Sequence, residues 1–257
     1  MREQLKSEGV CLFCKKTYKK AGINRHLHKH LESEVIQGKP GQSYLLKVEP
    51  DTSWGRTPYF LSLWMDGNTA MQDLDDFLRA IWLECCGHMS AFRNPKLQAR
   101  RSMFDFFEAE DLLEKGKTKE YEALMEASSG EIPMRRKAKK VFQKGLKLIY
   151  DYDFGSTTRL EIVVVAEYNT KAASDIVLLS RNEPIITPCS VCNKSAATQM
   201  CMQCIHHEDA LFCEACAKDH AEDCEDFYPD PIVNSPRSGV CGYDGGTIDT
   251  QRDTLVL

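Results

Sequence analysis

The sequence predicts an α+β fold: a central mixed domain with a helical insertion, flanked by small cysteine-rich modules. Three observations support this prediction. The chain has 257 residues, 42% of them hydrophobic, which suffices for one sizeable core with small satellites. Strand-like segments and an amphipathic helix occur together within residues 42–182, which favours the α+β class. Cysteines and histidines gather in close pairs near both ends of the chain.

The first part of the central domain is expected to run strand, strand, helix. Residues 43–48 and 59–65 are rich in aromatic and aliphatic side chains, as strands are. Thr69 follows a turn and is the expected N-cap of a helix over 70–86. Apolar side chains recur at helical spacing along this helix, so it should bury one face. Cys85 on that face is interpreted as a small buried apolar residue.

The second part of the domain is expected to contain an insertion and three more strands. Residues 97–145 are charged and poor in β-branched side chains, which predicts two or three helices. Strands are then expected at 146–154, 159–168 and 175–179. The run 162–166 is continuously apolar, which predicts a central strand buried on both faces.

Eight potential metal ligands form four close pairs between residues 189 and 224. A Cys-x2-Cys pair supplies two sulfurs from one tight turn, and a His-x3-Cys pair supplies two ligands from one helical turn. Because a tetrahedral zinc site needs four ligands, the eight predict two zinc ions rather than disulfides or free thiols. The segment has few large apolar residues, so zinc would supply its folding energy. The pairs are Cys189 with Cys192, Cys201 with Cys204, Cys213 with Cys216, and His220 with Cys224.

A third metal site is expected near the N-terminus, where Cys11 and Cys14 precede His26 and His30. The histidines are spaced to share one face of a helix, so both can bind one ion. His28 would point away from that ion. The pattern is close to a two-Cys, two-His zinc finger, with one residue fewer than usual between the pairs. A basic, partly helical segment whose Cys and His residues align by accident is the alternative.

Nine of the twelve cysteines belong to these two patterns. Cys85, Cys86 and Cys241 do not, and Cys241 is interpreted as either a spare ligand or a free thiol. With three zinc ions expected, the chain divides into a zinc finger at 1–36, the α+β domain at 42–182, a two-zinc module at 188–228 and a glycine-rich tail at 229–257.

Charge is distributed unevenly along the chain, whose formal net charge is −5. Residues 1–30 carry eight Lys or Arg against two Glu, and residues 131–147 carry seven against one Glu. Residues 189–257 carry twelve Asp or Glu against four Lys or Arg. The basic segments could contact phosphates, whereas the acidic segment suits a protein partner or simple solvation.

Nucleic-acid binding is one hypothesis that follows from this distribution. If the helix of the N-terminal finger entered a major groove, Lys19, Gly22 and Arg25 would face the bases, and Gly22 could not read one. One finger spans only about three base pairs, which is too few for specific affinity without help. That help could come from a dimer or from the basic stretch 135–147, in which Arg135 and Arg136 could make a weak, salt-sensitive contact.

No membrane contact is expected, because no run approaches the roughly 18 apolar residues of a membrane span. The first thirty residues lack the long apolar run of a secretory signal, and thiolate ligands persist where the compartment is reducing. We therefore expect a soluble, cytoplasmic protein. Nothing in the sequence indicates an oligomeric state.

Four elements of the central domain form a recognisable combination. They are Tyr44-Leu45-Leu46-Lys47-Val48 as first strand, the helix through Asp76-Phe77-Leu78, Ile81 and Trp82, the His88-Met89-x2-Phe92 element, and Tyr152-Asp153-Phe154-Gly155 before a hydrophobic strand. In these elements roughly half of the chain resembles the plasmid open-reading-frame-three-like domain family, named from a root-inducing plasmid. The resemblance implies a compact α+β fold, found in bacteria, archaea and mobile elements, and implies no established activity.

The chain departs from that family after its Tyr-Asp-Phe-Gly element. Members continue with an Asp, then a Trp and a His at alternate positions, whereas this chain has Ser156, Thr158 and Leu160. A polar site that used those positions would be lost here. His88 and Asp153 remain, and the hypothesis of an enzyme activity depends on them as a residual acid/base pair.

The C-terminal pattern resembles two cross-braced two-zinc modules, the B-box and the MYND finger. Its His-x3-Cys ending is nearer to MYND, and its Cys-x2-Cys third pair is nearer to the B-box. Relatives of these modules mostly bind proteins or peptides. Ligand pairs alternate in such modules, although His206 or His207 could replace a ligand. The resemblance implies one site of Cys189, Cys192, Cys213 and Cys216, and another of Cys201, Cys204, His220 and Cys224.

A non-enzymatic zinc protein that connects protein or peptide partners is the function favoured by these observations. All three expected sites have four protein ligands, whereas a catalytic zinc needs an open position for water. The sequence contains no phosphate-binding glycine loop, Ser-His-Asp pattern or metalloprotease motif. The resemblance of the central domain would link this function to mobile elements. Nucleic-acid binding and catalysis by the central domain are the alternatives.

Overall fold

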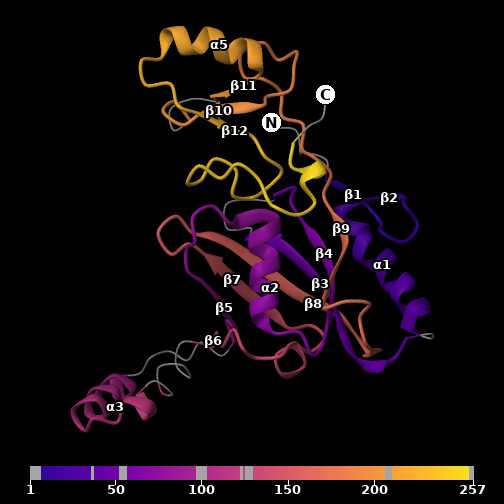
Figure 1. Ribbon diagram of the computed structural model, residues 1–257, viewed down its shortest axis with the longest axis vertical. Helices are drawn as coiled ribbons and strands as arrows, with labels where there is room; N and C mark the ends of the chain where they lie inside the picture. Colours follow the sequence, from indigo (N-terminus) through magenta and orange to yellow (C-terminus); the bar gives the residue numbers. More distant parts are fainter. Residues whose placement is uncertain are drawn as a thin grey trace.

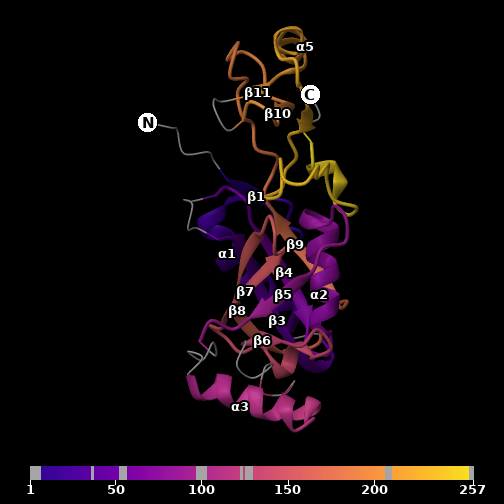
Figure 2. The ribbon, with the colours of Figure 1, turned by 90° about the vertical axis from the view of Figure 1, so that its left-hand side faces the viewer.

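The computed structural model is built around a seven-stranded antiparallel sheet with a helix on each face (Figures 1 and 2). The α+β class predicted from the sequence is confirmed. The strand order is β6-β5-β7-β8-β3-β4-β9. The strands are β3 (Pro40–Pro50), β4 (Leu61–Asp66), β5 (Ser90–Arg93), β6 (Glu131–Ile132), β7 (Lys147–Tyr152), β8 (Thr158–Thr170) and β9 (Ile176–Arg181). The structure describes residues 7–35, 38–51, 57–96, 103–121, 124, 130–205 and 210–254.

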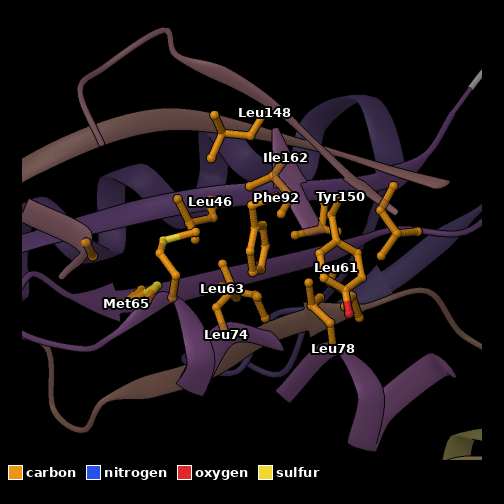
Figure 3. Close-up of a cluster of buried hydrophobic side chains, with 14 of the residues drawn as sticks. Leu46, Leu61, Leu63, Met65, Leu74, Leu78, Phe92, Leu148, Tyr150 and Ile162 are labelled. Atoms are coloured by element: carbon orange, nitrogen blue, oxygen red, sulfur yellow. The ribbon is translucent and has the colours of Figure 1, made fainter. Parts of the chain in front are cut away.

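The main core lies between one face of this sheet and α2 (Met71–Leu78). Alternate residues of β4, among them Leu61 and Leu63, point to this face, and Leu74 and Leu78 of α2 pack against them (Figure 3). These side chains are fully buried. Each such burial is worth about 1.5–3 kcal/mol, so this layer contributes substantially to the stability of the domain.

Part of the opposite face of the sheet is covered by α1 (Lys20–Val35), as Figure 2 shows. Ile23, Leu27 and Leu31 recur every four residues on one side of this helix, and all three are fully buried. They pack in one cluster with Trp64 and Tyr168 of the sheet. The helix expected for an N-terminal finger is therefore part of the core of the central domain.

A hairpin before α1 lies along the outer edge of β9. It consists of β1 (Glu8–Val10) and β2 (Thr17–Lys19). The backbone N–H of Leu12 donates to Leu179 O at 2.9 Å, and the N–H of Glu183 donates to Glu8 O at 2.8 Å. The last strand of the sheet thus has a backbone partner on its second edge as well.

The helix expected over 70–86 is shorter and changes its geometry. Its α-helical turns end at Leu78, and Arg79–Leu83 form a π-helical segment, η2. Carbonyls of this segment accept hydrogen bonds from the C-terminal end of the chain. The N–H of Thr247 donates to Ala80 O at 2.7 Å, and the hydroxyl of Ser235 donates to Trp82 O at 2.6 Å.

Thr69 is not the N-cap of α2, contrary to the sequence prediction. The N-cap is Ala70, whose N–H donates to the carboxylate of Asp73 at 2.8 Å. The hydroxyl of Thr69 instead donates to the backbone and side chain of Asp175. Thr69 is buried beside the turn before β9, which places these acceptors closer than the helix.

Strand β8 is central, as expected, but only one of its faces is fully buried. Ile162 and Val164 lie in the main core, whereas Val163 and Val165 are half-buried. Val165 packs against the cluster that contains Ile23, Leu27 and Leu31 of α1, whereas Val163 does not. The prediction that 162–166 is buried on both faces is wrong, because α1 shields only part of the second face.

The charged insertion is partly helical within the described residues. It includes α3 (Met103–Glu114), which stands away from the sheet (Figure 1), and a helical stretch at 118–121. Near the end of the insertion, Glu131 and Ile132 were predicted to be helical but form strand β6. They pair with β5, and Ile132 packs against the main core. A 3-10 turn, η3 (Ala138–Lys140), follows. None of the helices in the described parts of the chain combines the length and apolar character that a membrane span requires.

The C-terminal module is a three-stranded sheet with one helix. Its strand order is β11-β10-β12, and α5 (Glu214–Asp223) follows β11. Among the described residues its buried apolar cluster consists of Cys201, Ala210, Phe212 and Ala217. A core of this size cannot stabilise a module by itself. The strands are β10 (Gln199–Cys201), β11 (Leu211–Phe212) and β12 (Pro229–Pro231).

Residues 232–254, here called the C-terminal segment, run between this module and the central sheet (Figures 1 and 2). The segment ends in a 3-10 turn, η4 (Thr250–Arg252). Arg181 at the end of β9 is fully buried and donates to Asp253 Oδ1 at 2.6 Å and to Asn234 O at 2.7 Å. The glycine-rich tail expected from the sequence is therefore attached to the central domain by buried polar contacts.

Candidate metal centres

All twelve cysteines and four histidines of the chain lie in four clusters that could hold metal ions. Each cluster offers four ligand atoms, and within a cluster these atoms all lie within 4.8 Å of one another. The clusters are Cys11, Cys14, His26 and His30; Cys189, Cys192, Cys213 and Cys216; Cys201, Cys204, His220 and Cys224; and Cys85, Cys86, His88 and Cys241.

The N-terminal cluster joins the hairpin to α1. Cys11 and Cys14 lie in the turn between β1 and β2, and His26 and His30 lie one turn apart on α1. Cys14 Sγ is 3.2 Å from His26 Nε2, and the two histidine Nε2 atoms are 3.1 Å apart. His28 points elsewhere, as expected, and its Nδ1 lies 2.6 Å from the hydroxyl of Tyr168.

The protein favours one thiolate in this cluster before any ion binds. The backbone N–H of Lys16, with help from His30 and His26, lowers the pKa of the Cys14 thiol to about 6. Burial raises the pKa of Cys11 instead. A second thiolate is therefore disfavoured until a cation compensates it, which is the chemistry of a thiolate metal site.

The first C-terminal cluster joins the start of the module to the start of α5. Cys189 and Cys192 lie in one turn, closed by the N–H of Asn193 donating to Cys189 O at 3.0 Å. Cys213 is the N-cap of α5 and Cys216 follows in its first turn. The Sγ atoms of Cys192 and Cys213 are 3.9 Å apart.

The second C-terminal cluster joins β10 to the end of α5. Cys201 and Cys204 lie in a turn, while His220 and Cys224 are one helical turn apart. The Sγ atoms of Cys204 and Cys224 are 3.9 Å apart. The ring of His220 stacks on Phe212, with ring centroids 4.4 Å apart. The four pairs therefore alternate between two clusters, which is the arrangement implied by the resemblance to cross-braced modules.

Both C-terminal clusters also contain favoured and disfavoured thiolates: backbone N–H groups lower the pKa of Cys192 in the first, and burial raises the pKa of Cys204 to about 12 in the second. Burial opposes ionisation of Cys189, but backbone N–H groups overcome it and lower its pKa to about 6. In the same cluster the pKa of Cys216 rises to about 12, mainly because its side chain interacts with the thiol of Cys213. Burial likewise opposes ionisation of Cys201, yet His220 and backbone N–H groups bring its pKa to about 6. His206 and His207, which could have replaced a ligand, lie outside the described residues.

The fourth cluster was not predicted from the sequence. Cys85 is half-buried, and its Sγ lies 3.5 Å from Arg237 Nη2 and within 4.8 Å of three other ligand atoms. Cys85 packs against the main core, as its interpretation as an apolar core residue implied, but it is only half-buried, because the chain leaves the helix before Cys85 and turns toward the C-terminal segment. A Cys-Cys-x-His run at 85–88 was the available signal, but its last partner is distant in the sequence.

His88 and Asp153, the hypothetical acid/base pair, are close to each other: His88 Nε2 lies 3.6 Å from Asp153 Oδ2. The same carboxylate oxygen accepts a hydrogen bond from Arg237 Nη2 at 2.8 Å. This bond is the main reason why the pKa of Asp153 falls to about 2. An ion-paired carboxylate of this kind is a poor general base, so the geometry gives the enzyme hypothesis no further support.

The basic residues proposed for nucleic-acid contact fall into two separate groups. Lys19 and Arg25 are exposed at the start of α1 and on its outer side. Arg135 and Arg136 are exposed beside the start of α2, where the N–H of Met71 donates to Arg136 O at 2.9 Å. Because α1 and α2 cover opposite faces of the sheet, the two groups do not form one continuous surface (Figure 2).

Comparisons with known proteins add little to this geometry. No family model and no protein of described function matches the chain. A solved structure of a protein of unknown function from Methanosarcina mazei Go1 aligns with 54% of this chain and 67% of its own, at 15% identity and a TM-score of 0.35. The resemblance of the central domain to the plasmid open-reading-frame-three-like family therefore stays a prediction.

Replacing His26 by Ala should remove one zinc ion per chain, because only three of the four N-terminal ligand atoms remain. The matched control is His28→Ala on the same helix, which loses a hydrogen bond to Tyr168 worth about 1 kcal/mol but no ligand. Metal content is measured by mass spectrometry of the intact chain under non-denaturing conditions. Equal zinc content in the two variants would contradict a metal site at this cluster.

Proposed function

We propose that the chain is a non-enzymatic zinc protein that acts by binding another protein. The observation that supports this most is the completeness of the ligand sets. Each of the three clusters expected from the sequence brings four Cys or His ligand atoms within 4.8 Å of one another. Four protein ligands fill a tetrahedral zinc, which leaves no open position for water or substrate. Zinc in these clusters stabilises the fold instead of performing chemistry.

A groove on the C-terminal module is the proposed binding surface. It has a volume of about 670 Å³ and lies between strands β10 and β12 and the start of α5. Its lining includes small apolar and polar groups from Ala196, Ala215 and Gln199. Surfaces of this size can accept a few side chains of an extended partner segment.

A buried carboxylate in the groove suggests the chemistry of the partner. Asp230 lines the groove, is 5% exposed, and its Oδ2 makes no hydrogen bond within the described part of the chain. Burial raises the pKa of this carboxyl group. A cationic group of a partner would supply the missing donor.

The helix whose first turn lines the groove is acidic as well, which favours a basic partner segment. The helix α5 and the turn after it expose six acidic side chains against one lysine. These side chains are Glu214, Asp219, Glu222, Asp223, Glu225 and Asp226, and the lysine is Lys218. We therefore propose that the partner presents a Lys- or Arg-rich segment.

Short synthetic peptides rich in Lys and Arg should bind the full chain, and Asp230→Asn should weaken this binding about tenfold. A charge-assisted hydrogen bond is worth about 1.5–3 kcal/mol, which corresponds to at least that factor. Binding is followed by fluorescence anisotropy at about 150 mM salt, where exposed charges are screened.

Asp226→Asn is the matched control, because it removes the same charge from an exposed position outside the groove. It should change the affinity by less than about twofold. Equal losses for Asp226→Asn and Asp230→Asn would contradict a role for the groove. Binding of oligonucleotides but of no peptide would favour the nucleic-acid alternative through Lys19, Arg25, Arg135 and Arg136.

A further inference from the structure

We propose that Cys85, Cys86, His88 and Cys241 bind a fourth zinc ion, which fastens the C-terminal segment to the central sheet. This site goes beyond the three expected zinc ions and does not depend on the adaptor function. Its first three ligands follow η2, and its fourth comes from the C-terminal segment. Thiolate and imidazole together are the ligand set that zinc prefers.

The distances within the cluster fit a tetrahedral site. With Zn–S bonds of about 2.3 Å, two sulfurs on one zinc lie about 3.8 Å apart. The Sγ of Cys86 is 3.7 Å from that of Cys85 and 3.6 Å from that of Cys241. His88 Nε2 lies 3.0 Å from Cys86 Sγ and 3.5 Å from Cys241 Sγ. The separations match those between cysteines of the C-terminal clusters, which are 3.9 Å.

The backbone on both sides is shaped to bring these ligands together. Gly87 has φ of 77°, a left-handed conformation that turns Cys86 and His88 toward the same point. A Cβ at this position would meet no neighbouring atom within 4 Å in the described structure, so there is room for a side chain. Glycine is favoured here because of its left-handed backbone conformation. On the other side Cys241 and Gly242 have φ of 56° and 62°. A non-glycine residue in this region is uncommon and here directs its thiol into the cluster.

A buried arginine donates a hydrogen bond to one of these ligands. Arg237 is fully buried, and its Nη2 donates to Cys85 Sγ at 3.5 Å and to Asp153 Oδ2 at 2.8 Å. Its Nη1 donates to Ser156 O and Thr158 Oγ1 at 3.1 and 3.0 Å. The hydrogen bond to Cys85 Sγ stabilises the thiolate form of this ligand and fixes its position. Arg237 also belongs to the C-terminal segment, so it contributes to the same junction.

The fourth site is more exposed than the other three. Cys86 and Cys241 are exposed, whereas every other cluster includes at least one buried cysteine. Solvent access to a metal site controls how easily a competing ligand reaches it. The fourth zinc is therefore the most readily exchanged of the four, and its loss weakens the junction between the C-terminal segment and η2.

The test uses the full chain, purified under reducing conditions, with Zn²⁺ as the only added metal. Mass spectrometry under non-denaturing conditions should find four zinc ions per chain for the natural sequence and three for Cys241→Ser. A colorimetric chelator should remove one ion in a fast phase that Cys241→Ser lacks. Hydrogen exchange of the C-terminal segment should rise in this variant, while exchange over 189–224 stays unchanged.

Two further variants keep the outcome interpretable. Met89→Ala changes a side chain that is 71% exposed next to His88, and it should retain all four ions. Cys86→Ser alters a second exposed ligand and should repeat the loss seen with Cys241→Ser. Three ions in every variant, a persistent fast phase, or a Cys86–Cys241 disulfide in the reduced preparation would each overturn the proposal. If the natural chain held fewer than four ions, an equal zinc content in Cys241→Ser would still overturn the proposal, and one ion fewer in that variant would support it.

Discussion

Replacing Cys201 by Ser should unfold the C-terminal module while the central sheet stays folded. The buried apolar cluster of the module contains, within the described residues, only Phe212 and three small side chains. Structural zinc supplies about 10–16 kcal/mol of folding free energy in small modules, far more than such a cluster can. Because α5 carries ligands of both C-terminal clusters, loss of one ion should also weaken the other. Hydrogen exchange over residues 189–231 measures this directly.

Val191→Ala is the control for this prediction. Val191 lies between two ligands of the first C-terminal cluster, but its side chain is 63% exposed and makes no part of the buried cluster. The variant should keep its zinc and its slow exchange. If Cys201→Ser exchanged as slowly as Val191→Ala, zinc would not be the source of the module's stability.

Replacing Arg181 by Met should lower the free energy of unfolding by about 3–5 kcal/mol, because it breaks a buried ion pair on one side only. The guanidinium is fully buried and donates to Asp253 Oδ1 at 2.6 Å and to Asn234 O at 2.7 Å. Asp249 Oδ2 lies 3.3 Å from the same group. Without Arg181 these acceptors lose their donor inside the protein. Chemical denaturation followed by circular dichroism measures the loss.

Arg252→Met is the matched control, since Arg252 pairs with Asp249 and Glu183 but is half-exposed. Exposed pairs contribute about 0–1 kcal/mol, so this variant should be nearly as stable as the natural chain. The double variant Arg181→Met with Asp253→Asn should recover part of the loss, because it removes the unpaired charge. Equal losses of unfolding free energy in Arg181→Met and Arg252→Met would show that burial of the ion pair does not determine its contribution to stability.

The metal clusters near the two ends could be predicted because their ligand pairs are local. Cys-x2-Cys fits one turn, and His26 with His30 fits one helical face, so spacing alone groups them. The fourth cluster could not be predicted in this way, because 155 positions separate Cys86 from Cys241. Only the fold of the central domain and the path of the C-terminal segment bring these two sulfurs together.

The apolar side of α1 could also be seen in the sequence, but its partner could not. Ile23, Leu27 and Leu31 are spaced for one face of a helix, which fits an isolated finger equally well. The structure places this face against Trp64 and Tyr168, residues of two different strands. Long-range packing of this kind has no local signature. The N-cap prediction for Thr69 was wrong for the same reason. Its hydroxyl bonds to Asp175, which is distant in the sequence, and not to the helix that follows it.

The hairpin of β1 and β2 has a consequence for how copies of the chain behave in solution. An exposed outer strand is a template for pairing with another molecule and thus for aggregation. At the other end of the sheet β6 has only two residues, which offers little to pair with. At β9 the protection comes from the backbone bonds of Leu12 and Glu183. These bonds depend on the fold around Cys11 and Cys14, so a metal ion bound there would guard the protein against edge-to-edge self-association.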